Sequence, residues 1–550
     1  MAAAGPAPLA RRPLVAVALL LAAYAVLSLL NDPRGQLGSD SGGKVATLKV
    51  MKERDRLRPD LGYWAERYDP AGQVHPLVLT QRVDDRWVNV TTLPMLYAAF
   101  PLYRLGGYRL ALLVPMLGGV AAALAARALA RRLADGDGWS AFWLIGLASP
   151  VLVYALDFWE HTVGLAAMAW GVVALWDLVE GERGPWAALT AGGLFGVAAT
   201  MRTEALAYGA VAVATAAVFM VARRRRLGPA LITGSLAAAG LAVPLLANLA
   251  LEVAVLGKPF RSGRAAGTAA DAGAEAGLRL REALAGAVGL FDKTAALPLV
   301  LGLALVTLMA VAAWQAGRPS GNRRVVALTL AGAAVLYGTR VALGPAVLPG
   351  LAVAAPLAVV GGVLGWRIPR ARYLLVVALA ALPLVWATQY PGAALNHVGA
   401  RYVLLSGLLL ATLGVVALGG LPPWAQRAFP ALAVAVTAYA FSFMVVRTNS
   451  FARAGAELAD RPEPVLVSRF SHLHRDGGAF YGEHLWLSAA SAAEQRLAVG
   501  VVERAGFDRF GLVLPPGAAP GEIAGWRRNG TDRVELISDL DVTVTAYERG

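Results

Sequence analysis

Asp40 is the acidic residue whose surroundings most suggest chemistry. It stands between two serines in the Gly/Ser-rich segment Gly38–Lys44, shortly after an apolar run that ends at Leu30. We expect a turn here, where a membrane helix leaves the bilayer. A carboxylate in this position can act as a general base on a hydroxyl or an amine. Asp40 is therefore our candidate catalytic residue.

Other ionisable residues stand at the ends of apolar runs, where a charge is costly and is a functional candidate by default. Counting the runs places them on the same side of the membrane as Asp40. Arginines at a bilayer surface suit a phosphate, which they bind through charge-assisted, bidentate hydrogen bonds. The candidate phosphate-binding residues are Arg202, Arg401 and Arg340. The candidate supporting or substrate-binding residues are Glu204, Asp157, Glu160, His161, Asp69 and His75.

Each of these residues also has a purely structural interpretation. Each arginine alone can be an anchor at the membrane surface, with its stem in the apolar region and its head in water. Asp157 or Glu160 alone can simply end a helix. His472 and His474, on a possible strand, have no evident third metal ligand. We predict no metal residues or cofactor, although a divalent metal stays open, as does Asp69 as the base.

Composition identifies the membrane as the solvent of this chain. Of its 550 residues, 57% are hydrophobic and 16% charged, against about 25% charged in soluble domains. The absence of cysteine excludes disulfides and thiolate catalysis. The net charge of +14 comes from arginines in short loops between apolar runs, which is a positive-inside pattern and not a nucleic-acid-binding face.

The apolar runs predict a polytopic α-helical membrane protein with about 13 transmembrane helices. After the run 14–30, they lie near residues 108–130, 139–156, 160–178, 186–200, 203–222, 228–256, 295–316, 323–342, 345–366, 371–388, 401–420 and 427–446. The Pro-containing stretch 93–105 is predicted to be an interfacial helix. Arginines in alternate loops, including Arg11, Arg12 and those from Arg223 to Arg226, place the N-terminus in the cytoplasm. We expect the plasma membrane as the location.

Residues 1–450 are predicted to form the transmembrane domain, with long outer loops at 31–107 and 257–294. The second of these contains an amphipathic helical piece around Leu278–Val288. Residues 451–550 read as strand, helix and strands, which predicts a small extracytoplasmic α/β domain. The last span is expected to end near Val446, so a short linker holds this domain over Asp40. It is either a stabilising cap or a part of the acceptor site.

Several motifs resemble the GT-C superfamily of membrane glycosyltransferases, in the branch of the protein O-mannosyltransferases and the lipid A aminoarabinose transferase. Asp40 matches the acidic position in the first outer loop of that family, although many members carry a pair of acids there. The other motifs are Thr92–Tyr97 with Leu105–Arg109, Ala198–Ala205, Gly257–Pro259, Gly289–Asp292 and Gly399–Leu404. The resemblance implies a sugar donor on a polyprenyl phosphate and an inverting reaction.

The sequence therefore predicts a hexosyl- or pentosyltransferase that uses a polyprenyl-phosphate sugar, with Asp40 as the base. The acceptor would be a glycan, a lipid or a protein at the outer face of the membrane. The alternative is a flippase or transporter of lipid-linked glycans, which would need polar residues at mid-depth. Neither function involves nucleic acid as a partner.

Overall fold

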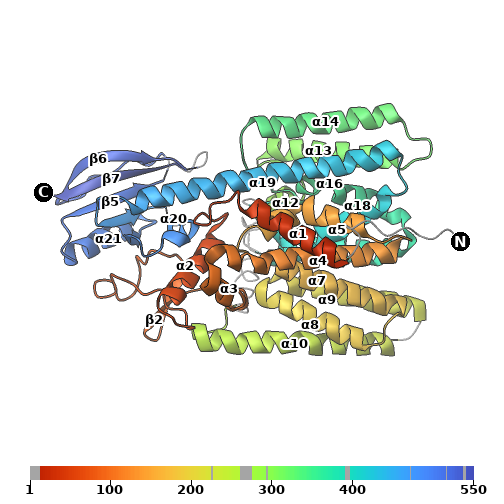
Figure 1. Cartoon of the computed structure of the whole chain (residues 1–550), viewed down its shortest axis with the longest axis horizontal. Coiled ribbons are helices and arrows are strands. Elements are labelled where there is room, and N and C mark those ends of the chain that lie inside the picture. Colours follow the sequence, from red (N-terminus) through yellow and green to blue (C-terminus); the bar gives the residue numbers. More distant parts are fainter. Residues whose placement is uncertain are drawn as a thin grey trace.

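The chain is largely helical, with one β-sheet near its C-terminus. The computed structural model describes residues 13–224, 227–260, 276–292, 295–389, 397–470, 472–515, 517–536 and 541–550. Figure 1 shows a bundle of long helices with the sheet at one end of it. Predictions that involve Arg11, Arg12, Arg225 and Arg226 lie outside the described residues, as do residues 261–275, 293 and 294 of the loop 257–294.

A helix is present in every predicted apolar run. The first are α1 (Pro13–Ser28), α4 (Leu113–Leu133), α5 (Trp139–Leu147), α6 (Pro150–Ala155), α7 (His161–Glu180), α8 (Trp186–Met201), α9 (Glu204–Arg224) and α10 (Gly228–Leu256). The amphipathic α12 (Ala276–Val288) follows, and then α13 (Ala296–Ala316), α14 (Arg323–Ala342), α15 (Leu351–Ala354), α16 (Pro356–Leu364), α17 (Arg372–Thr388), α18 (Leu404–Leu418) and α19 (Pro423–Ala459). Within the described ranges, 9 helices are long and apolar enough to cross a membrane, and α1 and α8 are apolar but shorter. The predicted number of 13 spans is not confirmed.

Proline explains why two of the predicted spans are broken. The run 139–156 divides at Ser149, whose side chain accepts a hydrogen bond from the Val151 amide, and Pro150 then begins α6. The run 345–366 divides in the same way at Pro356, which begins α16. Proline lacks the amide hydrogen that a helix interior needs, but it fits the first turn of a new helix. Two short helices therefore replace one long helix in each run.

The first long loop contains more regular structure than its composition suggests. The expected Gly/Ser-rich turn around Asp40 is wrong, because Ser39–Glu53 forms a helix, α2. Strands β1 (Thr80–Val83) and β2 (Arg86–Asn89) pair antiparallel. The predicted helix 93–105 is the first part of α3 (Leu93–Ala111), which kinks at Gly107, where φ is 65°. Its position at a membrane surface stays a prediction.

The C-terminal residues form the predicted α/β arrangement. Five strands, β3 (Val465–Ser468), β4 (Leu485–Ser488), β5 (Arg509–Leu514), β6 (Trp526–Val534) and β7 (Val542–Arg549), lie in the order β4-β3-β5-β7-β6. β3 is parallel to β4 and β5, and β7 is antiparallel to β5 and β6. Helix α21 (Ala492–Arg504) begins with a capping box between Ser491 and Glu494. Residues 472–480 form α20 (Leu473–Asp476) and the short helix η5 (Gly478–Phe480).

A single helix joins the bundle to this sheet. α19 has 37 residues, which corresponds to about 55 Å at the usual rise per residue. Figure 1 shows it running from the far end of the bundle to the sheet. The expectation of a short linker after about Val446 is wrong, because α19 continues as a helix to Ala459. The helix passes through Arg447 without a break, so one continuous helix attaches the sheet domain to the bundle.

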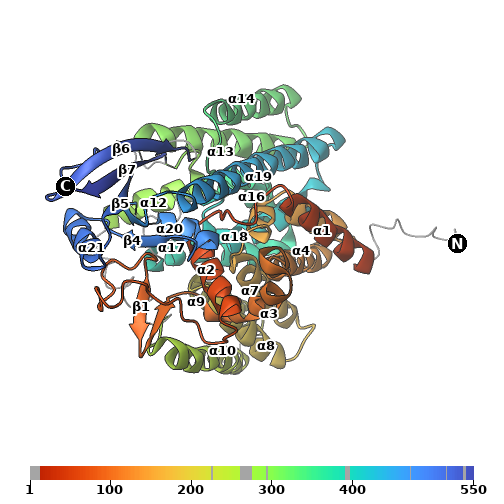
Figure 2. The same ribbon diagram turned by 60° about the vertical axis from the view of Figure 1, so that its left-hand side comes forward.

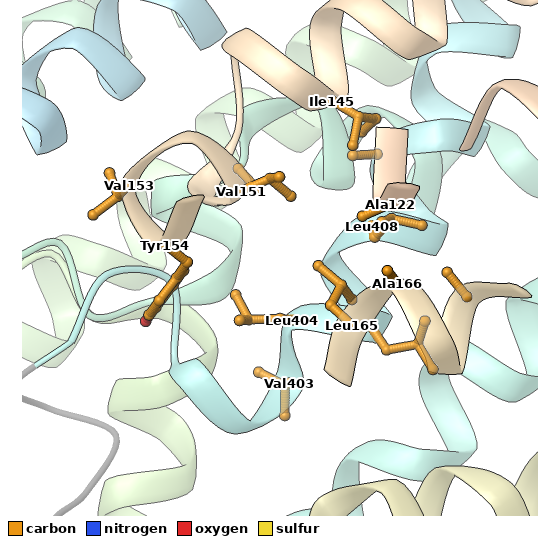
Figure 3. Packing of buried hydrophobic residues seen from close by; sticks show 14 of the residues in the cluster. Ala122, Ile145, Val151, Val153, Tyr154, Leu165, Ala166, Val403, Leu404 and Leu408 are labelled. Carbon is orange, nitrogen blue, oxygen red and sulfur yellow. The ribbon is translucent and has the colours of Figure 1, made fainter. Parts of the chain in front are cut away.

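The interior behind the first loop is packed with apolar side chains. Figure 3 shows side chains of α4, α5, α6, α7 and α18 meeting there. Tyr154 of α6 is fully buried among them, and its hydroxyl donates to the carbonyl of Val398. Leu404 begins α18 and Val403 directly precedes it, and both belong to the same buried cluster as Tyr154. This packing fixes the chain immediately before α18, which carries one of the site arginines.

Glycines allow α2 to pack directly against α20. The two helices lie side by side in Figures 1 and 2. A Cβ atom on Gly42 would lie 1.4 Å from the carbonyl oxygen of Arg475, and one on Gly478 would lie 1.9 Å from the carbonyl oxygen of Gly42. Neither position has room for a side chain. Close contact of the two backbones therefore outweighs the helix propensity of about 1 kcal/mol that α2 loses at each glycine.

We expect Gly42→Ala to lower the stability of the protein, because the added methyl group collides with backbone and cannot be relieved by a rotamer change. Overpacking of this kind typically costs about 1–3 kcal/mol. The measurement is the melting temperature of the purified chain. The matched control is Gly500→Ala in α21, where the nearest atom is the flexible end of Arg504, 3.2 Å away. A Gly42→Ala protein that melts at or above the wild-type temperature would contradict this contact.

Candidate functional site

Asp40 lies between two arginines that come from distant parts of the chain. It occupies the first turn of α2. Arg401, in the 3-10 turn η4 (Arg401–Val403), donates from Nη1 to Oδ2 of Asp40 at 3.3 Å. Arg475 of α20 places its Nη1 3.7 Å from the other carboxylate oxygen. The Asp40 side chain is 38% exposed, whereas both arginines are buried. The carboxylate is thus the accessible member of the group.

The start of α2 is held in place by Asp157. Its carboxylate accepts hydrogen bonds from the Ser41 hydroxyl at 2.5 Å, the Tyr108 hydroxyl at 3.1 Å and the Leu37 amide at 3.3 Å. From α19, Nε of Arg447 donates to the Leu37 carbonyl at 2.7 Å. Asp157 is completely buried. The structure therefore places it beneath the site as an anchor for the first turn of α2.

A chain of buried ion pairs continues from Asp40 into the bundle. Lys44, one helical turn after Asp40, lies 2.5 Å from Glu160. Arg202 contacts the other oxygen of Glu160 at 3.4 Å and donates from Nε to Glu204 at 2.9 Å. All four of these side chains are nearly inaccessible to solvent. Glu160 precedes α7, and Arg202 and Glu204 form the junction of α8 and α9, so the chain joins three helices to α2.

Tyr402 connects the two groups of charges. Its hydroxyl accepts a hydrogen bond from Nη2 of Arg401 at 3.2 Å. The guanidinium of Arg202 lies over the Tyr402 ring, 4.9 Å from the ring centre, which is cation–π geometry. Nη1 of Arg401 also lies 3.3 Å from Nε2 of His397. Arg401 is thus oriented from several sides.

His161 is buried beside these charges in an aromatic setting. Its ring stacks on Tyr154, with centroids 4.7 Å apart, and lies 5.0 Å from the Trp159 ring. Among the described residues, neither ring nitrogen has a hydrogen-bond partner. Trp159 in turn packs on Gly38, where a Cβ would lie 2.6 Å from its ring. His161 therefore packs among the aromatic side chains next to the charged cluster. Among the described residues, it makes no hydrogen bond to Asp40.

Cations outnumber carboxylates among the side chains that pair with Asp40, Glu160 and Glu204. The cations are Lys44, Arg202, Arg401 and Arg475, and the carboxylates are Asp40, Glu160 and Glu204. Burial works against ionisation of Asp40, but the charges of Arg401, Arg475 and Lys44 outweigh it and hold its pKa below the usual value. Asp40 is therefore ionised in the resting protein. The excess positive charge suits an anionic ligand.

Three of the predicted site residues lie apart from the cluster. Arg340 donates to the carbonyl of Gly344 and has Phe291 on one side, 5.4 Å from its guanidinium. Asp69 and His75 have partners within residues 62–87 of the first long loop. No contact in the described part of the chain joins any of the three to Asp40.

Asp69 and His75 have structural partners within the loop. Asp69 accepts from the Tyr63 hydroxyl at 2.9 Å and from the Val74 amide at 3.0 Å. His75 stacks on Trp87 with centroids 5.4 Å apart. Burial lowers the pKa of His75 to about 4, so its ring is neutral at physiological pH. These contacts fit folding of the loop.

Sequence reasoning missed Lys44 and Arg475. Lys44 follows Asp40 by four residues, a spacing that places both on one face of a helix. The expectation of a turn at Gly38–Lys44 hides this spacing, because it applies only to a helix. Arg475 is one of many arginines in the C-terminal region, and nothing local distinguishes it. Tyr402 lies within the motif Gly399–Leu404, but the sequence assigns no role to it.

The pair His472 and His474 does not form the strand suggested by its spacing. His474 lies in α20, and its ring meets the edge of Trp486 at 4.2 Å. Burial lowers the pKa of His474 to about 3. Across the described ranges, no group of three or more His, Asp or Glu side chains is arranged to hold a metal ion.

Comparisons with known proteins give structural neighbours but no sequence relative. No protein-family model and no curated protein matches the chain. ArnT from Cupriavidus metallidurans bound to undecaprenyl phosphate is similar with a TM-score of 0.45 and 14% identity, over 96% of this chain and 97% of that one. The oligosaccharyltransferase of Archaeoglobus fulgidus, in a complex with Zn and sulfate, is similar with a TM-score of 0.45 and 12% identity, over 90% of this chain and 68% of that one.

We expect Lys44→Met to destabilise the protein strongly, because it leaves Glu160 buried with one cation fewer. Breaking a buried pair from one side typically costs about 3–5 kcal/mol. The double variant Lys44→Met with Glu160→Gln removes both charges, leaves Arg202 paired with Glu204, and should recover much of that loss. Denaturant unfolding of the purified proteins measures both effects. A double variant no more stable than the single one would show that the pair is not coupled.

Proposed function

We propose that this chain is an integral-membrane glycosyltransferase that moves a sugar from a polyprenyl-phosphate donor to an acceptor on the outer face of the membrane. The observation that carries the proposal is the position of Asp40. It is an ionised, partly exposed carboxylate at the end of a helical bundle, between two buried arginines. A base and a phosphate-binding group are therefore adjacent. The motif resemblance stated above supplies the donor class.

In the proposed reaction, the donor phosphate replaces Asp40 as the partner of Arg401. The freed carboxylate then accepts a proton from the acceptor hydroxyl or amine. The acceptor oxygen or nitrogen forms a bond to the anomeric carbon, while the bond from that carbon to the phosphate oxygen breaks. The electron pair of the broken bond leaves with the polyprenyl phosphate. Arg401 stabilises the charge that develops on this leaving group.

Arg202 has a supporting role in this scheme. Two carboxylates, Glu160 and Glu204, already neutralise it. Arg202 lies over the Tyr402 ring, and the Tyr402 hydroxyl in turn accepts a hydrogen bond from Arg401, so Arg202 helps to hold Arg401 in position. Its charge also makes the electrostatic potential next to the donor phosphate more positive. The separate location of Arg340 favours a role in the packing of α14 for that residue. A glycan, a lipid or a protein each fits as the acceptor class.

The location of the charged cluster supports a transferase over a flippase. A transporter needs polar groups at mid-depth along a path through the bundle. Asp40, Arg401 and Arg475 meet where α2 lies against α20, and Glu160, Arg202 and Glu204 stand at the ends of α7, α8 and α9 and not in the middle of a helix. A transferase needs its charged residues grouped around one reaction centre. A flippase instead needs polar residues along the whole path of its substrate through the membrane.

We expect Asp40→Asn to reduce sugar transfer by about 10²–10⁴-fold, the usual effect of losing a general base. Donor binding should be retained or tighter, because the arginines no longer have a carboxylate partner. The assay measures release of polyprenyl phosphate from polyprenyl-phosphate hexoses and pentoses, with an envelope extract as the acceptor source.

The matched control for this test is Asp85→Asn, which changes an exposed carboxylate between β1 and β2 of the same loop. It should transfer sugar at the wild-type rate. Wild-type activity in the Asp40→Asn protein would exclude Asp40 as the base. Movement of a labelled lipid-linked glycan across proteoliposomes, without any glycosylated product, would favour the flippase instead.

A further inference from the structure

The sheet domain contributes a side chain directly to the Asp40 site. Arg475 belongs to α20, which lies between β3 and β4 in the chain. Its guanidinium reaches across to α2 and lies 3.7 Å from Asp40, while its side chain is only 4% exposed. In the described part of the chain, Asp40 is the one carboxylate within ion-pair distance of Arg475. Burial of an arginine to this extent requires a partner, and here the partner is the candidate catalytic residue.

The contact between α2 and α20 is shaped around this arginine. Gly43, next to Gly42 in α2, would place a Cβ 3.0 Å from Nε of Arg475, so the absence of a side chain leaves room for the guanidinium. That Nε atom is buried and has no hydrogen-bond partner among the described residues. The same is true of Nε of Arg401. Each arginine therefore has donor capacity that Asp40 does not use.

Arg401 and Arg475 approach Asp40 from opposite parts of the molecule and share its single charge. Arg401 contacts Oδ2 and Arg475 contacts Oδ1. Lys44 and Arg202, in contrast, share two carboxylates, Glu160 and Glu204. The uncompensated positive charge of the cluster therefore lies at Arg401 and Arg475. Two guanidinium groups around one oxyanion form a pattern that also fits a phosphate, which offers more acceptor oxygens than a carboxylate.

Building on the proposed function, we propose that Arg475 and Arg401 together bind the phosphate of the lipid donor, and that this binding releases Asp40 to act as the base. The sheet domain is then a part of the donor site and not a cap. Phosphate binding and base activation are coupled, because both depend on the same two arginines. An enzyme without donor keeps its carboxylate engaged in ion pairs.

Binding of three probes to the full-length protein in nanodiscs tests this proposal. The probes are a polyprenyl phosphate, the polyprenol of the same length, and inorganic phosphate. The wild-type chain should bind the phosphate lipid more tightly than the alcohol. In Arg475→Gln this preference should fall by about tenfold or more, the range expected for a lost charge-assisted hydrogen bond. Binding of the alcohol should not change, which also shows that the variant is folded.

Two further variants sharpen the result. Arg475→Lys keeps the positive charge but lacks the planar guanidinium. We expect it to lose part of the preference for the polyprenyl phosphate over the polyprenol. This variant decides the question if Arg475→Gln does not fold. Arg496→Gln is the matched control, because Arg496 is exposed on α21 of the same domain. It should bind all three probes as the wild type does.

The outcomes separate this inference from the proposed function. A wild-type protein without preference for the phosphate lipid would overturn both. A wild-type preference that Arg475→Gln retains would overturn the role of Arg475 alone. Inorganic phosphate that binds as tightly as the phosphate lipid would assign the arginine pair to free phosphate and overturn the donor site.

The pH dependence of transfer gives a readout that a purely structural arginine would not affect. The groups that face Asp40 are Lys44 on its own helix, Arg401 from η4, Glu160 before α7, and His472, Arg475 and Asp476 from the α20 region. Removing the charge of Arg475 raises the pKa of Asp40. The acidic limb of kcat/KM should therefore move to higher pH in Arg475→Gln and stay in place in Arg496→Gln. If the acidic limb of kcat/KM stays at the same pH in both variants, the proposed coupling between phosphate binding and the basicity of Asp40 is wrong.

Discussion

Buried charge has to be paired, and this requirement organises the region where the bundle meets the sheet. Removing a charged side chain from water costs several kcal/mol, which only close partners and hydrogen bonds offset. Lys44 and Arg202 meet this requirement through Glu160 and Glu204. These partners come from α2 and from the starts of α7 and α9. The pairing therefore fixes how those helices lie relative to each other, and it ties the first long loop to the bundle.

Rigid attachment of the sheet domain is the second requirement of the site. An arginine on a loosely tethered domain cannot hold a phosphate in a defined position. Here α19 extends as one helix from the bundle to the sheet. Gly42 and Gly478 then bring α20 into backbone contact with α2. Arg447 of the same long helix holds the chain before α2, so both sides of the site are fixed by a common element.

The sequence predicted the helices and the charged residues of the cluster other than Lys44 and Arg475, and the physical reasons for this also explain the failures. Apolar runs of spanning length have few alternatives to a helix, so each predicted run contains one. The one-sided placement of Asp40, Arg401, Glu160 and Arg202 follows from counting those runs, and the structure brings these residues together. Arg475 could not be found in this way, because its contact depends on how two domains dock. Glycine content led to the wrong expectation of a turn at Asp40, since tertiary packing overrides helix propensity.

The environment of Asp40 involves a conflict that the proposed coupling resolves. A carboxylate between two arginines is stable when ionised, but it is a weak base, because those charges oppose uptake of a proton. A base that stayed in this state would contribute little to catalysis. A donor phosphate adds negative charge beside Asp40 and occupies the arginines, and both changes raise the proton affinity of the carboxylate. The residue thus becomes an effective base only when the sugar to be transferred is present, which disfavours activation of an acceptor in an empty site.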